Sequence, residues 1–127
     1  METSCPFCEI DPGEILFAND LALVLVDRYP VAEGHMLVIP RRHFESYFDA
    51  TPDEIAALHL LTIQCRDYLD KRFQPDGYNI GINIGKPAGQ SIFHLHIHLI
   101  PRYRGDHPRP WGGVRNILPR KGDYRVD

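Results

Sequence analysis

Polar and apolar residues alternate most clearly over residues 92–100, where aliphatic side chains separate three histidines. His94, His96 and His98 occupy every second position. Because successive side chains of a β-strand point to opposite faces, this pattern predicts a strand with all three imidazoles on one face. A half-buried structural strand is the alternative. Three of the chain's seven histidines within five positions favour a functional site instead.

Shorter hydrophobic runs, each bounded by turn-forming residues, predict further strands earlier in the chain. Asn19-Asp20 separates the first two runs and indicates a hairpin. Together with the histidine segment, the predicted strands are 15–18, 21–26, 35–39, 78–84 and 92–100.

One long helix is predicted to begin after Thr51. Thr51 as N-cap, Pro52 in the first turn and Glu54 three residues after the cap form a capping box. Apolar residues then recur on one stripe as far as Leu69, and a Pro-Asp-Gly run at 75–77 ends the element. The expected fold class is α+β: a single antiparallel sheet of about five strands with one long helix packed on one face.

Length and composition are those of one globular domain over residues 1–127. The chain has 127 residues, 43% of them hydrophobic and 24% charged. After about residue 102 the composition turns to Arg, Pro and Gly, which predicts a largely irregular tail over 102–127. No apolar run approaches the ~20 residues of a membrane span, and residues 1–4 begin no secretory signal. A cytoplasmic location is therefore expected, and the three cysteines are interpreted as thiols or metal ligands.

Charge is distributed unevenly along the chain, although the net charge is only -3. Residues 1–76 hold 6 Lys and Arg against 14 Asp and Glu, a balance of -8, whereas residues 77–127 hold 8 against 3, a balance of +5. The basic half contains the histidine strand, which suits a substrate that carries phosphate. A solvated basic tail is the alternative, and no lysine-rich run or RNA-binding motif supports a nucleic-acid partner.

Two chemistries could use the histidine row. Imidazole is a common metal ligand, but the Cα atoms of His94 and His98 would lie about 13 Å apart along a strand, too far for one ion to take all three rings. The other chemistry is nucleophilic catalysis on an anionic electrophile such as phosphorus, with one imidazole attacking and its neighbours donating to the developing charge.

The segment His94–Ile100 resembles the signature of the histidine-triad (HIT) superfamily of nucleotide hydrolases and nucleotidyl transferases. Residues 27–43 resemble the ribose- and base-binding segment of that family, and Asn83 with residues 89–91 resembles its phosphate loop. The resemblance extends from Cys5 to about residue 114. It implies an enzyme that acts on a nucleotide and forms a homodimer.

The resemblance also implies roles for particular side chains. His96 would attack the α-phosphorus to give a nucleotidyl-histidine that water hydrolyses, His98 and Ser91 would support the charge, and His35 would assist beside the triad. Asp27 would accept hydrogen bonds from the ribose hydroxyls. The complete set implied for substrate binding is Asp27, Asn83, Gly89, Gln90, Ser91 and His98. A turn-forming Asp27, a core histidine at position 35 and a simple glycine turn at 85–91 are the structural alternatives.

Cys5 and Cys8 form one half of a metal site, and two free thiols are the alternative interpretation. The resemblance to zinc-bearing HIT proteins implies His43 and His94 as the other two ligands. Four protein ligands leave no open position, so the expected Zn²⁺ is structural and no catalytic cofactor is expected.

The favoured substrates are dinucleoside polyphosphates such as diadenosine tetraphosphate, because residues 101–106 resemble that branch of the family. Arg102, Arg104 and Arg109 could hold the distal phosphates, and Trp111 could stack on a second base. Asn83 stands where that branch often carries Gln, which conflicts with this choice, so hydrolysis of adenosine phosphoramidates is an alternative, as is nucleotidyl transfer (or phosphorolysis). A non-catalytic, nucleotide-binding regulatory module is an alternative of a different class.

The long helix carries more apolar residues than one sheet face needs to bury. Surplus apolar surface of this kind is expected where a second subunit covers it, which supports the homodimer. The surplus residues are Leu60, Leu61, Ile63 and Tyr68.

Overall fold

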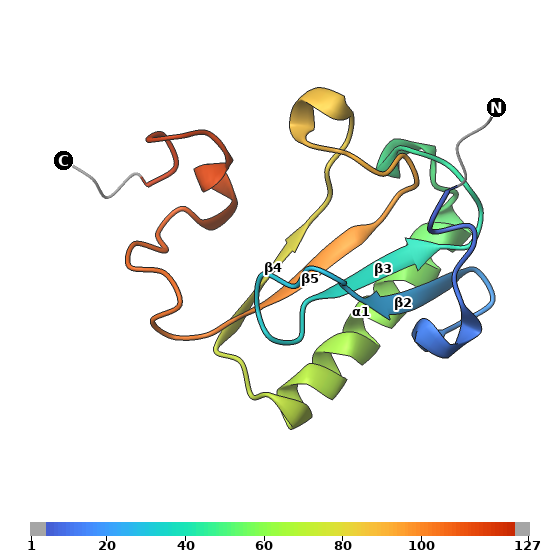
Figure 1. Ribbon diagram of the computed structural model, residues 1–127, viewed down its shortest axis with the longest axis horizontal. Coiled ribbons are helices and arrows are strands. Elements are labelled where there is room, and N and C mark those ends of the chain that lie inside the picture. The colour runs from blue at the N-terminus through green and yellow to red at the C-terminus, as the bar shows by residue number, and fades with distance from the viewer. Residues whose placement is uncertain (1–4, 124–127) are drawn as a thin grey trace.

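Within residues 5–123, five antiparallel strands form one sheet and a single α-helix packs against one of its faces, as the computed structural model of the chain shows (Figure 1). The structure describes residues 5–123, and residues 1–4 and 124–127 lie outside the description. The sheet order is β1-β2-β3-β5-β4. The α+β class predicted from the sequence is confirmed. The elements are β1 (Ile15–Ala18), β2 (Ala22–Val26), β3 (Met36–Pro40), α1 (Pro52–Arg72), β4 (Gly77–Gly81) and β5 (Ile97–Arg102), with short 3-10 helices at Pro12–Glu14, Tyr47–Asp49, Lys86–Ala88 and Gly113–Ile117.

The hairpin between β1 and β2 is held by the side chain of Asn19. Its Oδ1 accepts hydrogen bonds from the backbone N–H groups of Leu21 and Ala22, at 3.1 and 2.9 Å. Its Nδ2 donates to the carbonyl of Ala57 in α1 at 3.0 Å. Asparagine satisfies the local turn and, at the same time, ties the hairpin to the helix.

Strand β5 begins later and ends later than the sequence predicts. The expected strand covers 92–100, whereas β5 covers Ile97–Arg102 and passes through Pro101. The late start follows from the pairing with β3, which runs only from Ile97 to Leu99, and the late end follows from the pairing with β4, where Gly77 lies opposite Arg102. His94 and His96 therefore precede the ladder and only His98 lies within it. Strand β4 is likewise shorter than the expected 78–84.

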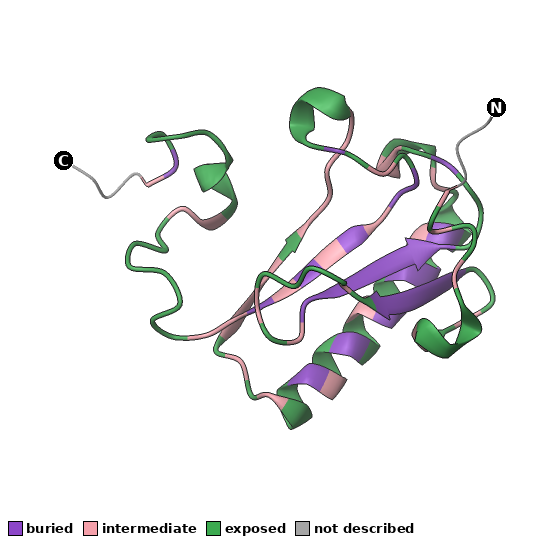
Figure 2. Ribbon diagram, in the orientation of Figure 1, coloured by how far each residue is buried: buried purple, intermediate pink, exposed green. Residues whose placement is uncertain are grey.

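The side of the sheet that faces α1 carries the main hydrophobic core (Figure 2). Leu95, Ile97 and Leu99 are all buried on this side, so the alternation expected of the histidine segment is kept even before the ladder begins. Helix α1 contributes Leu58, Leu61, Cys65 and Leu69, and each is at most 2% exposed. Burial raises the pKa of the Cys65 thiol to about 12, which makes it a small hydrophobic residue.

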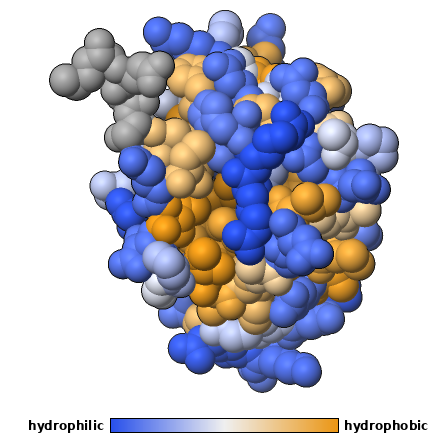
Figure 3. Space-filling model, turned by 90° about the vertical axis from the view of Figure 1, so that its right-hand side faces the viewer, coloured by the Kyte–Doolittle hydropathy of each residue, from blue (hydrophilic) through white to orange (hydrophobic). Residues whose placement is uncertain are grey.

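The opposite side of the sheet is only partly covered. A second cluster on it consists of Leu23, Leu25, Leu37 and Ile39. Three partly buried residues of the N-terminal segment pack against this cluster: Phe7, Ile10 and Ile15. From the side where this segment lies, exposed apolar surface is bordered by hydrophilic side chains (Figure 3).

The capping box predicted for α1 is present and is extended by an ion pair. The Thr51 side chain accepts from the N–H of Glu54, and the Glu54 carboxylate accepts from the N–H of Thr51. Arg42 donates two hydrogen bonds to Glu54, at 2.8 and 3.0 Å. Since Arg42 precedes His43, this pair connects the start of the helix to the loop that follows β3.

The tail after β5 lies beside β4 and away from the N-terminal segment (Figure 1). In its described part, up to residue 123, Gly113–Ile117 form a 3-10 helix, and Arg102 still belongs to β5. No helix within residues 5–123 has the length and apolar character needed to cross a bilayer. The expected cytoplasmic location and the ends of the domain predicted over 1–127 stay predictions.

The Glu54 carboxylate should give the fold a measurable dependence on acid. Hydrogen bonding to Arg42, assisted by Thr51, lowers the pKa of Glu54 from 4.5 to about 2. The stabilisation is therefore complete above pH 4.5 and is lost as the pH falls toward 2. We expect Glu54→Gln to reduce the free energy of unfolding by about 1–3 kcal/mol at pH 7, and this deficit to shrink below pH 4.

Urea denaturation of both proteins between pH 3 and 7 measures this effect. Asp53→Asn, an exposed change one residue away, serves as the control and should leave the pH dependence unaltered. A Glu54→Gln deficit that stays constant over this range would show that the carboxylate charge contributes nothing.

Candidate active site

A cavity of about 430 Å³ lies on the sheet face opposite α1, next to the N-terminal segment. One part of its wall is polar and comes from β5 and from the loop before it. The other part is largely apolar and comes from β2, β3 and the N-terminal segment. Its lining includes Phe7, Ile10, Glu14, Leu25, Val26, Asp27, Arg28, Tyr29, Leu37, Asn83, Gly89, Ser91, Ile92, His96 and His98.

The sheet register sets the order of groups across this cavity. His98 pairs with Leu37 of β3, and Leu37 pairs with Leu25 of β2. Neighbouring strands are about 4.8 Å apart, so an imidazole and two leucines lie in a row across the sheet. A ligand with a polar and an apolar end could lie along this row.

His96 has one ring nitrogen committed to the backbone. Its Nδ1 lies 2.8 Å from the carbonyl oxygen of His94. A carbonyl only accepts hydrogen bonds, so Nδ1 carries the proton and Nε2 keeps its lone pair. An unprotonated Nε2 on a ring that lines the cavity is the form of imidazole that can attack an electrophile.

His98 has the opposite tautomer, and His35 sets it. The backbone N–H of Val31 donates to His35 Nδ1 at 3.2 Å, so neutral His35 carries its proton on Nε2. That Nε2 lies 3.0 Å from His98 Nδ1 and donates to it, which places the His98 proton on Nε2. Burial lowers the pKa of both rings and so favours these neutral forms.

Asp27 lies next to the two histidines, within the cavity wall. Its Oδ1 accepts from the N–H of Tyr29 at 2.7 Å, and its Oδ2 is 3.4 Å from His35 Nε2. Asp27, His35 and His98 are close enough to suggest a metal centre. The protonated Nε2 of His35 argues against one, because metal coordination requires that lone pair.

The loop between β4 and β5 supplies part of the polar wall. Asn83, Gly89 and Ser91 line the cavity, as their predicted roles require. Gln90 differs from the prediction, because its side chain is buried and bonded within the protein. Its Oε1 accepts from the N–H of Gly85, and its Nε2 donates to two backbone carbonyls. Gln90 therefore shapes the loop and does not present its amide to a substrate.

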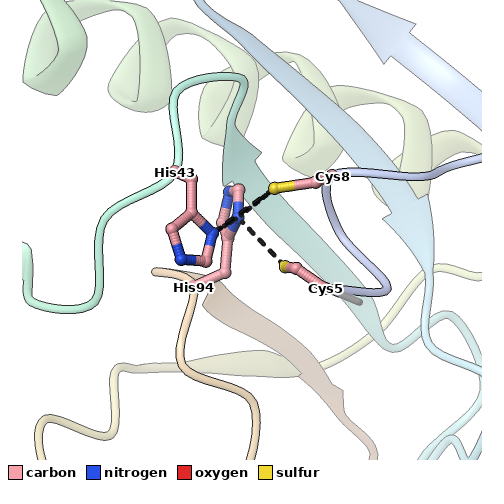
Figure 4. Close-up of side chains that lie close together, drawn as sticks. All are labelled: Cys5, Cys8, His43 and His94. Carbon is pink, nitrogen blue, oxygen red and sulfur yellow. Dashed lines mark hydrogen bonds between the residues drawn. The ribbon is translucent and has the colours of Figure 1, made fainter. Parts of the chain in front are cut away.

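Cys5, Cys8, His43 and His94 converge on one point beside the cavity (Figure 4). His94 Nδ1 lies 3.5 and 3.6 Å from the two sulfur atoms and 3.1 Å from His43 Nδ1. Ligand atoms around a tetrahedral zinc with ordinary bond lengths are about 3.3–3.8 Å apart, so the nitrogen–sulfur distances lie in this range and the nitrogen–nitrogen distance is slightly shorter. His94 Nε2 donates to the Pro40 carbonyl at 2.8 Å, which leaves Nδ1 unprotonated. The cluster fits a tetrahedral metal ion.

Phe7 connects this cluster to the cavity. It lies between the two cysteines in the sequence, and its ring makes edge contacts with His94 and His96, with centroids 5.9 and 5.1 Å apart. Phe7 also lines the cavity. Any displacement of the cysteine loop would therefore move a side chain that packs on His96.

The tail arginines do not lie where the sequence interpretation requires. Within residues 5–123, Arg102, Arg104 and Arg109 are absent from the cavity lining, and so is Trp111. Arg102 is at the far end of β5 from His96 and makes two hydrogen bonds of 2.8 Å to Asp106. In this chain the arginines cannot hold the distal phosphates of a ligand in the cavity, because β5 carries them away from it.

The apolar wall was only partly identified from the sequence. Tyr29 and Leu37, which lie within the segment 27–43 predicted to bind ribose and base, line the cavity together with Val26, whereas Val24 is buried in the core beneath α1. Leu25, the neighbour of Val24, lines the cavity and pairs with Leu37 across the strands. The sequence analysis gave no individual role to the remaining lining residues from the N-terminal half, which are Pro6, Phe7, Ile10, Glu14, Leu25 and Arg28.

Comparison with known proteins places the chain in a family. The HIT domain profile matches residues 9–105, so the chain belongs to the HIT family. An uncharacterised HIT-like protein of Saccharolobus solfataricus is 34% identical over 125 residues, which are 95% of this chain and 87% of that protein. The bis(5'-adenosyl)-triphosphatase of Dictyostelium discoideum is 38% identical over 97 residues, 76% of this chain and 65% of that protein. An adenylylsulfatase of Arabidopsis thaliana is 34% identical over 110 residues, 84% of this chain and 56% of that protein.

Solved structures share the fold. A HIT family protein from Bacillus anthracis superposes with a TM-score of 0.75 at 34% identity, covering 80% of this chain and 75% of that one. A Zn-bound histidine triad family protein from Mycobacterium smegmatis gives a TM-score of 0.73 at 34% identity, covering 81% of this chain and 78% of that one.

Proposed function

We propose that the protein hydrolyses nucleoside phosphate derivatives through a covalent nucleotidyl-histidine. One observation carries the proposal: His96 donates its Nδ1 proton to the His94 carbonyl, and the ring, with Nε2 unprotonated, lines a cavity. A ring held in this tautomer is prepared for attack on phosphorus. The named hydrolases among its relatives support the same reaction class.

In this mechanism the α-phosphate lies at the polar end of the cavity. His96 Nε2 attacks phosphorus, a P–N bond forms, and the bond to the leaving group breaks. His98 Nε2–H, with the Ser91 hydroxyl and the Asn83 amide, donates to phosphate oxygens as charge develops on them. Water then attacks phosphorus, a P–O bond forms and the P–N bond breaks, the proton of the water passes to solvent, and His96 Nε2 regains its lone pair. His35 acts through His98 by fixing its tautomer.

Asp27 and the apolar wall complete the proposed nucleotide site. The carboxylate of Asp27 has acceptor capacity for the ribose hydroxyls beyond its bond to Tyr29. Leu37 and Leu25 follow in the direction away from His98, where the base would lie. The Gly89 position is open, since nothing lies within 4 Å of a Cβ placed there, so its backbone is accessible to phosphate.

Dinucleoside polyphosphates are the favoured substrates because the relative from Dictyostelium discoideum is named as a bis(5'-adenosyl)-triphosphatase. The tail arginines do not support this choice of substrate, because they lie outside the cavity lining. Hydrolysis of an adenylyl compound with a smaller leaving group is the second candidate, which the adenylylsulfatase relative favours. Transfer to phosphate or another acceptor would share the first half-reaction.

We propose that the Cys5, Cys8, His43 and His94 cluster holds a structural zinc ion. The zinc would supply a cross-link among the N-terminal segment, the loop after β3 and the segment before β5, with no part in bond making or breaking. Burial and the neighbouring Cys5 raise the pKa of the Cys8 thiol, so metal binding there should release protons and weaken in acid.

We also propose a homodimer formed through α1 and the edge strand β4. Two residues of the predicted surplus, Leu61 and Tyr68, are used within the chain, where Tyr68 packs on Phe17. Leu60 and Ile63 stay exposed. They are joined by Ile80 of β4, which is 53% exposed at a sheet edge that has backbone groups available for pairing.

The nucleophile assignment is tested by single substitutions. His96→Ala should lower kcat roughly ten-thousand-fold while nucleoside monophosphate still binds, because the cavity keeps its other walls. His98→Ala should lower kcat roughly 100-fold to 1000-fold, because one donor to the charged oxygens is lost. Rates with diadenosine tetraphosphate and with adenosine phosphoramidate, each with and without added phosphate, measure turnover, substrate choice and acceptor.

Acid quenching of the wild-type reaction should trap a labile nucleotidyl adduct that His96→Ala lacks. Gln90→Ala serves as a control in the same loop, and it should lower the free energy of unfolding while kcat falls far less than in His96→Ala. Substantial turnover by His96→Ala without an adduct in the wild type would exclude the covalent mechanism. Binding without any turnover would favour the regulatory module.

The zinc proposal makes a prediction about stability. Protein purified without added zinc should contain about one equivalent per chain, and Cys8→Ser should lose it. We expect Cys8→Ser to lower Tm by roughly 5–10 °C, the shift for about 2 kcal/mol in a chain of this size. A chelator should lower the Tm of the wild type and leave that of Cys8→Ser unchanged.

Cys65→Ala is the matched control, because it removes a buried thiol outside the cluster and should keep the metal. Native protein that is free of zinc yet as stable as zinc-loaded protein would show that the cluster is two thiols and two histidines without a metal function.

The dimer is tested by substituting Ile80, the exposed residue at the proposed interface. Wild-type protein at micromolar concentration should have the mass of two chains by light scattering, and Ile80→Lys should shift it to one chain by placing charge at the strand edge. Leu21→Lys, at an exposed position next to β2, should leave the dimer intact. A single-chain mass for the wild type would contradict the proposal.

A further inference from the structure

Two charged residues line the apolar end of the cavity, and the proposed chemistry uses neither of them. Glu14 ends the 3-10 helix before β1, and Arg28 follows Asp27 after β2. They face each other as an ion pair, with one guanidinium nitrogen of Arg28 3.3 Å from each carboxylate oxygen. A charged pair beside apolar side chains is a candidate for hydrogen bonding to the polar edge of a bound ligand.

The sheet register places this pair at the end of the row that begins at His98. Leu25 pairs with Ile15 of β1, and Glu14 directly precedes Ile15. His98, Leu37, Leu25 and Ile15 are thus successive partners, which span about 14 Å over three strand spacings. A nucleotide with its phosphate at His98 and its base over the leucines would direct the outer edge of the base toward Glu14.

The Glu14–Arg28 pair contributes little to the stability of the fold. The two side chains are 44% and 72% exposed, and the contact is long and uses one guanidinium nitrogen. Exposed ion pairs of this kind add at most a small fraction of the folding free energy. The other guanidinium N–H groups and the remaining carboxylate lone pairs are therefore available to a ligand.

We infer that Glu14 and Arg28 are specificity-determining residues that select guanine as the base. The edge of guanine presents, in order, the N2 amino group, N1–H and the O6 carbonyl. A carboxylate accepts only, so the two oxygens of Glu14 match the adjacent N1–H and N2–H donors. Arg28, beside it, donates to O6. The charge on both partners strengthens these hydrogen bonds relative to neutral pairs.

Adenine fits the same pair less well. Its N1 is an acceptor with no proton, and the carbon that replaces the guanine amino position carries only C–H. In the orientation that suits guanine, the Glu14 carboxylate would face the adenine N1 lone pair and receive no donor. If adenine shifts so that Glu14 accepts from its N6 amino group and Arg28 donates to N1, two hydrogen bonds form, against three with guanine. Pyrimidines are shorter and would leave their polar edge over the leucines. The pair therefore discriminates among bases, whereas the leucines only accommodate them.

This inference rests on the proposed function, because it takes the cavity to be a nucleotide site, and binding of products tests it separately from turnover. Calorimetric titration of the wild type should give a Kd for GMP about tenfold lower than for AMP. Glu14→Gln should reduce this ratio to about twofold or less by weakening GMP and leaving AMP nearly unchanged. Arg28→Ala should also weaken GMP more than AMP.

Glu9→Gln, an exposed change in the same N-terminal segment and outside the cavity lining, should keep the tenfold ratio. Equal or tighter binding of AMP by the wild type overturns the inference while leaving a nucleotide hydrolase in place. An equal loss of GMP and AMP affinity in Glu14→Gln also overturns it, because the carboxylate would then support the cavity without reading the base. Failure of both nucleotides to bind overturns the inference and the proposed nucleotide site together.

Discussion

The imidazole of His94 is completely buried, and the geometry around it organises both the metal cluster and the cavity. Its Nε2 is bonded to the Pro40 carbonyl at the end of β3, and its Nδ1 faces the two cysteines and His43. Its own backbone carbonyl holds the Nδ1 proton of His96. Because a buried polar group that lacks a partner is costly, each of these contacts constrains the others. The position of His96 therefore depends on a ring that does not itself line the cavity.

The two faces of the sheet divide stability from chemistry. Helix α1 covers one face with a closely packed core, while the N-terminal segment covers the other only in part and leaves the cavity. The alternation of side chains in β5 then assigns Leu95, Ile97 and Leu99 to the core and directs His96 and His98 to the cavity. One strand can contribute to both the core and the cavity because its successive side chains point to opposite faces of the sheet.

Local signals in the sequence predicted the features that depend on neighbouring residues. The capping box at Thr51 and Glu54 and the hairpin at Asn19 involve contacts within a few positions, and both are present. The start of β5 depends on how far β3 pairs with it, and the position of Arg102 depends on the direction of β5. Neither feature can be predicted from the residues next to it in the sequence. The role of Gln90 could not be predicted without its hydrogen bond to the distant carbonyl of Glu45. The position of Glu14 in the cavity could not be predicted without the register of the strands that separate it from His98.

Burial and hydrogen bonding act together on the charge of the site. Burial lowers the pKa of His98, and the proximity of His96 and His35 adds to that effect, so His98 is neutral near neutral pH. Protonating His98 would place a second donor on Nδ1, 3.0 Å from the Nε2–H of His35, where one donor already points. Val31 prevents His35 from relieving this conflict by exchanging its tautomer, because its backbone N–H occupies Nδ1. The fixed main chain around residue 31 thus determines, through two rings, which nitrogen of His98 offers a proton to the cavity.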